Sequence, residues 1–360
     1  MGFDKGKMNF SAIVLPEKQD TQFETSLLQE SYKPTKPSLE SPVEDFTAGH
    51  SLAGLGRQAT PEDFAEDGTL YFCCRQRELK INAQEYRERV QLRIKEFRNR
   101  NGSLKREDVK QIQEEVRLAL ETSATEKVTG TRCVLAESRN ILLVEAVTTK
   151  SVDDVVTFIE GDIVLTPVGT PGKVWSPEYL YERWAGKKAN VYVSIPIKGM
   201  RCVTGMGPDF LTWMFMASES EGLLPEGIKC GITGDMQMTD CREVATGAEN
   251  ISLKKGQPPN GREVITCLEQ GKKLVSAEFA FDFDGTGMVA TLDSKLAVRK
   301  LGFMKGAVQG GMGERVIAAQ LLMSGIEKIF KAFINSEPAN AELINNWISA
   351  KKEYVAAQKV

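Results

Sequence analysis

The strongest constraint on the fold is a pair of helical apolar patterns separated by the dipeptide Asn101-Gly102. In both patterns, apolar residues recur every three or four positions, which is the period of one helix face. These residues are Tyr86, Val90, Ile94 and Phe97 in the first pattern, and Val109, Ile112, Val116 and Leu120 in the second. Asparagine and glycine tolerate the left-handed conformation that ends a helix. A short link between two amphipathic helices predicts an antiparallel helical hairpin at residues 82–124.

The segments on either side of this hairpin have the composition of strands. Residues 69–74, TLYFCC, form one apolar run, and residues 131–138 and 140–147 form two more that are joined by a turn. A helix is expected next, at residues 151–161. The order of sheet, hairpin, sheet and helix is typical of an α+β protein, not of a regular βαβ alternation. We therefore expect an α+β fold with mixed or antiparallel sheets and a protruding antiparallel helical hairpin.

A chain of 360 residues is too long for one typical core, so we expect several regions. The second half contains a predicted strand pair around Gly285, an amphipathic helix at residues 314–334 and a last helix after Pro338. Residues 191–197 and 202–206 are also predicted strands. The predicted regions are an N-terminal and central α+β region at residues 1–81 and 125–165, the hairpin at residues 82–124, a C-terminal α+β region at residues 166–336 and a C-terminal helical extension at residues 337–360.

Positive charge is concentrated around the hairpin, although the whole chain is mildly acidic. The formal net charge is −3, whereas residues 75–110 hold twelve basic residues against six acidic ones. This excess of six leaves a formal charge of −9 on the remaining residues. Arginine grips phosphate oxygens in a bidentate fashion, but charged runs on helices are usually solvated faces. From the residues alone, a surface for an anionic polymer and an ordinary solvated helix surface both remain open.

The basic side chains of the first helix flank its apolar stripe on both sides. Arg89, Arg93 and Arg100 lie along one flank, and Arg87 and Arg98 lie along the other. Further cations follow in the turn and at the start of the second helix, where a helix dipole prefers anions. These are Lys105, Arg106 and Lys110. A purely structural hairpin would need fewer arginines, which favours an anion-binding surface.

Other residue types exclude several classes of site. The single histidine, His50, excludes multi-histidine metal sites and is expected to be an ordinary loop residue. The seven cysteines include no CxxC pair, which is typical of reduced, buried thiols. The apolar run from Phe10 to Leu15 is too short for a signal peptide, and no run is long enough to span a bilayer. We therefore expect a cytoplasmic protein that binds neither a metal nor a cofactor.

The sequence FDFDGTG at residues 281–287 raises an enzymatic alternative. Haloacid-dehalogenase-like phosphotransferases use such a motif after an apolar strand, with the first aspartate as nucleophile and the second as general acid beside Mg²⁺. Asp282 and Asp284 would take these roles here. However, only 73 residues follow Gly287, which is too few for the rest of such a domain. A hairpin turn at Asp284-Gly285 is a sufficient explanation.

Several blocks of the chain occur in the order found in the recombination-associated protein RdgC family, which the sequence resembles. The block DGTLYFCCRQRELKI resembles the strand that leads into the family's tip helices, and SLKREDVKQIQEEVRLAL resembles the exit of its hairpin. RNILLVEAVTTKSVDDVVTFIEG resembles the strand and helix that follow. The block from Gly261 to Phe303 resembles the family's C-terminal strand pair and basic strand. The order and spacing of these blocks carry the resemblance, and residues 165–260 match only loosely.

The resemblance implies a non-enzymatic DNA-binding protein of the bacterial nucleoid. Members of the family are homodimers that close into a ring with a positively lined hole, through which double-stranded DNA passes without sequence readout. Bound DNA is shielded from the RecA recombinase, so homologous recombination is restrained. The resemblance implies no catalytic residue, no cofactor and no membrane.

The resemblance also implies which residues contact DNA and which close the ring. A basic strand adds Lys295 and Arg299 as second-line candidates, which would share a strand face while Lys300 points away. The family can close its ring with an aromatic residue just after the second helix, where this chain has Thr125, and Leu118 is a substitute candidate. The predicted DNA contacts are Arg75, Arg77, Arg87, Arg89, Arg93, Arg98, Arg100, Lys105, Arg106, Lys110, Lys295 and Arg299.

Two alternatives to the DNA-binding hypothesis stay open. One is a Mg²⁺-dependent phosphotransferase or nuclease that uses Asp282 and Asp284. The other is a protein-interaction adaptor whose basic hairpin binds an acidic partner. The first predicts turnover with Mg²⁺, and the second predicts that the protein does not retain DNA at low salt.

Overall fold

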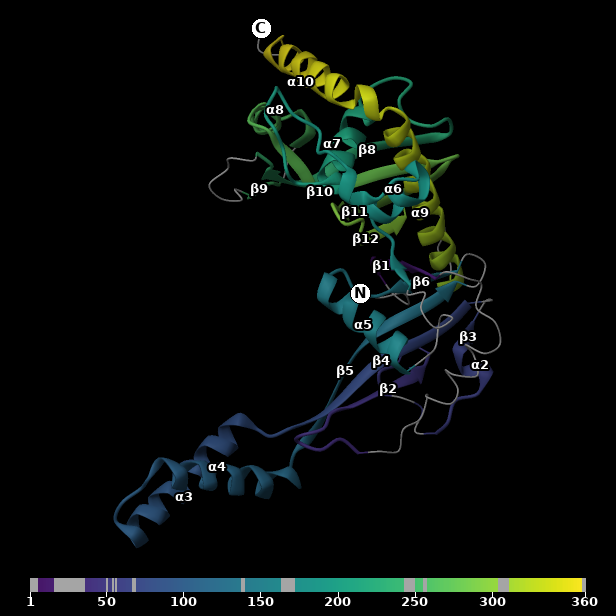
Figure 1. Cartoon of the computed structure of the whole chain (residues 1–360). Coiled ribbons are helices and arrows are strands. Elements are labelled where there is room, and N and C mark those ends of the chain that lie inside the picture. Colours follow the sequence, from purple (N-terminus) through teal and green to yellow (C-terminus); the bar gives the residue numbers. More distant parts are fainter. Residues whose placement is uncertain are drawn as a thin grey trace.

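The bowed molecule has the expected α+β architecture, with a helical hairpin protruding at one end and the C-terminal helix at the other (Figure 1). His50, the single histidine, lies outside the described residues. The computed structural model describes residues 6–15, 36–49, 51–53, 55, 57–66, 69–136, 140–162, 172–242, 250–254, 258–303 and 311–357.

The secondary structure alternates irregularly along the chain, as an α+β class requires. The described strands are β1 (Met8–Val14), β2 (Val43–Ala48), β3 (Ala65–Glu66), β4 (Thr69–Lys80), β5 (Thr125–Ala136), β6 (Ile141–Val144), β7 (Lys173–Val174), β8 (Ile228–Asp240), β9 (Asn250–Leu253), β10 (Lys272–Phe283), β11 (Thr286–Asp293) and β12 (Val298–Phe303). The described helices are α2 (Pro61–Phe64), α3 (Ala83–Asn101), α4 (Arg106–Glu121), α5 (Thr149–Asp162), α6 (Pro177–Ala185), η2 (Ala189–Val191), α7 (Met206–Ser218), η3 (Pro258–Asn260), α8 (Arg262–Glu269), α9 (Met312–Asn335), η4 (Glu337–Ala339) and α10 (Asn340–Ala357).

The described strands form one twelve-stranded antiparallel sheet that crosses the whole molecule. The main path runs β2-β4-β5-β6-β1-β12-β11-β10-β8-β9, while β3 pairs with β4 and β7 pairs with β1. Strand β1 joins the two halves, because Met8 and Phe10 pair with β12 whereas Ser11 to Val14 pair with β6. The sheet therefore runs across the predicted regional boundary at residue 165, and the division into regions stays a prediction.

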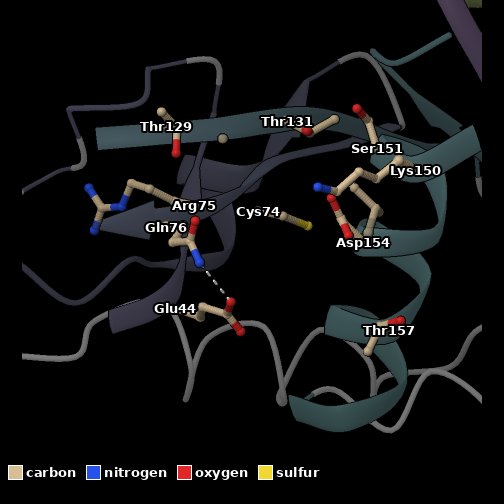
Figure 2. Close-up of a pocket in the computed structure, with 12 residues that line it drawn as sticks. Glu44, Cys74, Arg75, Gln76, Thr129, Thr131, Lys150, Ser151, Asp154 and Thr157 are labelled. Carbon is tan, nitrogen blue, oxygen red and sulfur yellow. Dashed lines mark hydrogen bonds between the residues drawn. The ribbon is translucent and has the colours of Figure 1, made fainter. Parts of the chain in front are cut away.

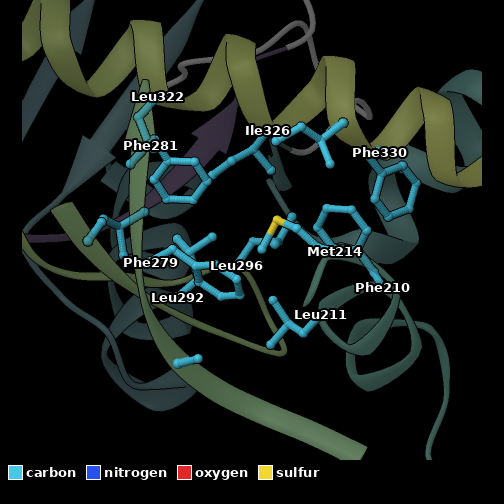
Figure 3. Packing of buried hydrophobic residues seen from close by; sticks show 14 of the residues in the cluster. Phe210, Leu211, Met214, Phe279, Phe281, Leu292, Leu296, Leu322, Ile326 and Phe330 are labelled. Atoms are coloured by element: carbon cyan, nitrogen blue, oxygen red, sulfur yellow. The ribbon is translucent and has the colours of Figure 1, made fainter. Parts of the chain in front are cut away.

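The larger core lies between the sheet and the helices α7 and α9 (Figure 3). Phe279, Phe281 and Phe283 alternate along β10 and point into this core. Helix α7 is buried nearly all round, and Phe210 on it meets Phe330 of α9 edge to face at 4.8 Å between ring centroids. The largely apolar run at residues 210–216 is therefore part of a helix that is enclosed on every side.

A close approach between α9 and β10 depends on Gly325. A Cβ atom added at this position would lie 2.0 Å from the ring of Phe283, which no side chain could tolerate. Glycine therefore lets the helix rest directly on the phenylalanine face of the strand.

The predicted strands at residues 191–197 and 202–206 are wrong. Residues 189–191 form the short helix η2 and Met206 begins α7. Between them, the two runs contribute only isolated bridges, at Ile197 and Cys202, among the described residues. Instead of a strand partner, the buried carboxylate of Asp209 accepts hydrogen bonds from Tyr192 (3.0 Å), Ser194 (2.9 Å) and the backbone of Ile195 (2.7 Å). Burial raises the pKa of the Asp209 carboxyl, while the ion pair with buried Lys273 opposes this.

A second, smaller core lies where α5 covers the sheet near its other end. Val152, Val155 and Ile159 of α5 are buried in one cluster with Phe46 and Phe72 of the sheet. Beyond this cluster β4 and β5 continue as a paired ribbon as far as Lys80 and Thr125. The ribbon leads into the helical hairpin, which thus lies away from both cores (Figure 1).

The hairpin of α3 and α4 has an apolar core of its own. Val90, Ile112, Val116 and Leu120 are buried in it, and the other residues of the two predicted stripes apart from Val109 are partly buried and pack against them. Val109 is half-buried. Gly102 follows α3 with φ of 71°, the conformation expected of a helix-ending glycine. Both helices fall inside the predicted range of residues 82–124, so local periodicity and one turn account for this element.

The C-terminal helix α10 is docked on the larger core. Ile344 and Ile348 are fully buried, and the helix packs against α7 and α8. Trp347 meets Phe215 edge to face at 4.9 Å and donates a hydrogen bond from Nε1 to Glu219 at 3.0 Å. The predicted extension is therefore part of the folded body in this structure.

Candidate nucleic-acid interface

The exposed surface of the hairpin carries most of the predicted cations. Two of them have a carboxylate partner on the same helix: Arg89 Nη2 lies 2.7 Å from Glu85, and Arg93 Nη1 lies 3.3 Å from Glu96. Such exposed pairs contribute at most about 1 kcal/mol each, so a phosphate could compete for either arginine. The pairing nevertheless lowers the net positive charge around both side chains.

The remaining hairpin cations are exposed, and no carboxylate in the part of the chain that the structure describes forms an ion pair with them. They are Arg87, Arg98, Arg100, Lys105, Arg106 and Lys110. Their charges are therefore uncompensated at short range, which makes an anionic ligand favourable.

Arg75 and Arg77 lie on β4, where the structure gives them a different environment. The fully buried carboxylate of Asp45 accepts two hydrogen bonds from Arg75, at 2.6 and 2.8 Å, and it also lies 3.0 Å from Arg77 Nε. Arg77 also lies 3.4 Å from Glu126. The two arginine side chains are only 11% and 14% exposed. The ion pairs of these two arginines with Asp45 connect β4 to β2. A DNA phosphate could bind either arginine only by displacing a buried ion pair.

The expectation that Lys295 and Arg299 share one face of a strand is wrong. Lys295 lies in the turn between β11 and β12, because Asp293 Oδ1 accepts hydrogen bonds from the backbone N–H groups of Lys295 (2.9 Å) and Ala297 (3.0 Å). The Lys295 amine donates to Thr149 at the start of α5 (2.7 Å). Arg299 lies on β12 and pairs with Asp293 at 3.3 Å. The turn therefore separates the two cations.

The two residues predicted to close a ring lie near the base of the hairpin. Leu118 projects from α4 and is 56% exposed, although a single exposed leucine is common on protein surfaces. Thr125 is the first residue of β5 and donates a hydrogen bond to the carbonyl oxygen of Lys80 at 3.4 Å. Leu92 on α3 is also 60% exposed, and sequence reasoning did not single it out.

Two further cations of the hairpin, of which Lys95 is exposed and Arg117 is half-buried, were also missed. Lys95 and Arg117 directly follow Ile94 and Val116 of the apolar stripes, so their position on the helices was readable from the sequence. Arg117 is partly engaged, because it donates a hydrogen bond to the carbonyl oxygen of Leu39 at 3.3 Å.

A cavity of about 770 Å³ lies between α5 and the sheet at the foot of the ribbon (Figure 2). Strand residues form one wall, with a hydrogen bond of 3.2 Å between Gln76 and Glu44, and Lys150 and Asp154 of α5 form part of the other. The lining carries both signs of charge. It is therefore less suited to a polyanion than the hairpin surface is.

Asp282 and Asp284 lie at the turn between β10 and β11. Asp282 Oδ1 accepts a hydrogen bond from the backbone N–H of Gly285 at 2.8 Å, and Asp284 has φ of 50°. Within the described ranges, no group of three or more His, Cys, Asp or Glu side chains is placed to hold a metal ion. The hydrogen bond of Asp282 and the positive φ of Asp284 are both typical of a tight β-hairpin turn.

An α+β body with a protruding hairpin of exposed cations is typical of proteins that bind an anionic polymer. The family model described as "Putative exonuclease, RdgC" matches residues 11–190, which are half of the chain and include the whole hairpin. The chain therefore belongs to the RdgC family, as its resemblance predicted. Membership supports a recombination-associated protein that binds DNA.

The family match ends at residue 190, so the resemblance of residues 261–303 stays a prediction. Among curated proteins, none matches the chain. No helix within the described residues has the length and apolarity that a bilayer crossing demands.

Proposed function

We propose that the protein is a sequence-nonspecific, double-stranded DNA-binding homodimer that encircles DNA and restrains RecA-dependent recombination. The observation that carries the proposal is the set of exposed cations on a hairpin that protrudes from both cores. Lysine and arginine contacts to phosphates position a protein on DNA without reading its sequence. On this proposal the protein is associated with the bacterial nucleoid.

The shape of the chain supports a ring. The hairpin and α10 lie at the two ends of a bowed molecule (Figure 1). Two bowed chains that met at both ends would enclose a hole, and a two-fold arrangement would bring the same surface of each chain together. Leu118 and Thr125, near the base of the hairpin, are the proposed closing residues at one of these contacts.

We propose that binding needs no catalytic step. The family's printed description names an exonuclease, and Asp282 and Asp284 are this chain's own enzymatic alternative. Incubation with duplex DNA and Mg²⁺ should release no nucleotides. Mg²⁺-dependent release that Asp282→Asn abolishes would replace this proposal with a nuclease.

A DNA titration tests the proposed function directly. Affinity should be similar for unrelated duplex sequences, and its logarithm should fall linearly with the logarithm of salt concentration, because each phosphate contact releases counterions. A ring should remain on closed circular duplex longer than on linear duplex of the same length, from whose ends it can slide. Linearisation of the bound circle by a restriction enzyme is the matched control.

Two results of this titration would contradict the proposal. Failure of the full-length protein to bind duplex DNA at low salt would favour the adaptor alternative. Equal residence on circles and on linear duplex would contradict encirclement, although it would leave nonspecific binding intact.

A further inference from the structure

The hairpin presents two faces of different charge. On α3 and α4, the residues of the apolar stripes other than Val109 pack together in the hairpin core. Successive residues of an α-helix are rotated by about 100°, so the residues directly after and directly before each stripe residue project to opposite sides. Because both helices are right-handed and antiparallel, the residues that follow the stripe on α3 and those that follow it on α4 project from one common face. We call this the following face, and the opposite one the preceding face.

The following face is strongly basic. Its members directly after the stripe residues are Arg87, Gln91, Lys95 and Arg98 on α3, and Lys110, Gln113, Arg117 and Glu121 on α4. Five of these eight are cations and one is an acid. Arg106 also belongs to the following face. It lies three residues before Val109 on α4, and a step of three residues along a helix brings its side chain to the same flank as the residue that follows Val109. Arg117 alone among these cations has a carboxylate nearby in the described residues, Glu114 at 3.9 Å.

The preceding face is nearly balanced. Its members directly before the stripe residues are Glu85, Arg89, Arg93 and Glu96 on α3, and Asp108, Gln111, Glu115 and Ala119 on α4. Two of these eight are cations and four are acids, and Arg100 adds one more cation from the last turn of α3. Both close ion pairs of α3, Glu85 with Arg89 and Glu96 with Arg93, lie on this face.

We infer that the following face is the surface on which the hairpin contacts the DNA backbone, an inference that rests on the proposed function and assigns its site. Arg87 and Arg98 are eleven residues apart and therefore about 16 Å apart along α3, a span over which one DNA strand presents several phosphates. Arg106 and Lys110 extend the same surface onto α4. The preceding face would set carboxylates against those phosphates, and like charges repel.

Matched triple variants of the full-length protein separate the two faces. The following-face variant carries Arg87→Gln, Arg98→Gln and Lys110→Gln, and the preceding-face control carries Arg89→Gln, Arg93→Gln and Arg100→Gln. Each removes three positive charges, and glutamine keeps the helix propensity close to that of arginine and lysine. Far-UV circular dichroism and a thermal melt establish that both variants are folded.

The readout is the affinity for one duplex over a range of salt concentrations. The following-face variant should bind at least about tenfold more weakly, with a salt slope smaller by about two to three for each chain of the dimer, because roughly one counterion is released per lost phosphate contact. On this inference Arg89, Arg93 and Arg100 do not contact phosphates, in contrast to the wider set of contacts predicted from the sequence. The preceding-face variant should therefore lose clearly less affinity than the following-face variant, by about threefold at most, since only long-range charge is lost.

Equal losses in the two variants, or a larger loss in the control, would overturn the face assignment while DNA binding by the wild type persists. A wild-type protein that fails to bind at low salt would instead overturn the proposed function, and the two failures are therefore distinguishable.

Discussion

At the scale of single residues, the nearest carboxylate decides what an arginine can do. Arg75 and Arg77 share the buried carboxylate of Asp45 and are thereby held in the fold. Arg87 and Arg98 are exposed, and none of the described carboxylates pairs with them, so their charge is available to a ligand. The same residue type thus stabilises the fold on the ribbon, whereas on the hairpin it is available for the DNA contact that we propose.

Asp45→Asn should destabilise the protein by about 3–5 kcal/mol, because it removes the buried carboxylate that pairs with Arg75 and Arg77 and leaves the Arg75 guanidinium without that partner in a largely buried site. Urea denaturation followed by circular dichroism measures this change. Glu44→Gln is the matched control, since it removes the same charge from the next, exposed position of β2. An Asp45 variant as stable as this control would show that the cluster contributes little to folding.

At the scale of elements, the hairpin is stabilised by its own small core. This core consists of few residues, and the paired ribbon of β4 and β5 connects the hairpin to the body. Local unfolding of such an element requires less free energy than unfolding of the body, because it exposes less apolar surface. The cations of the hairpin depend on this core for their relative positions.

Leu120→Ala should reduce the free energy of opening of α3 and α4 by about 2–5 kcal/mol, because Leu120 is fully buried in the hairpin core. Native-state hydrogen exchange would show faster exchange of amides in both helices and unchanged exchange in β10. Leu118→Ala, two residues earlier on the exposed side, should change opening by less than about 0.5 kcal/mol. Uniform acceleration across the whole chain would contradict an independently opening hairpin.

At the scale of the whole molecule, one continuous sheet carries a body at one end and a cationic arm at the other. Strand β1 belongs to both halves, so the halves are built around a common sheet and not around a flexible linker. A bowed chain of this kind can surround a duplex only together with a partner.

The proposed ring therefore requires a dimer in solution. Light scattering on the full-length protein should give twice the chain mass of 39.8 kDa in the absence of DNA. A monomer at micromolar concentration, with unchanged mass after DNA is added, would rule out the ring.

The sequence by itself determined the elements whose cause is local. Two apolar stripes and Asn101-Gly102 predicted the hairpin, and an Asp-Gly turn between apolar runs predicted the pairing of β10 with β11. Local signals were sufficient here because helix period and turn chemistry depend on neighbours in sequence. The positions of Arg87 and Arg98 followed from the same period.

Only the tertiary structure decided the features that depend on distant partners. Residues 191–197 resemble a strand, but the buried carboxylate of Asp209 accepts hydrogen bonds from the Ser194 hydroxyl and the Ile195 backbone N–H, where a strand would pair with a neighbouring strand. Arg75 has the residue type of a DNA contact, but Asp45 pairs with it from a strand thirty residues earlier in the chain. Hydrogen bonds and buried ion pairs form between residues that are distant in sequence and close in the folded chain. A pattern of neighbouring residues in the sequence therefore does not identify these partners.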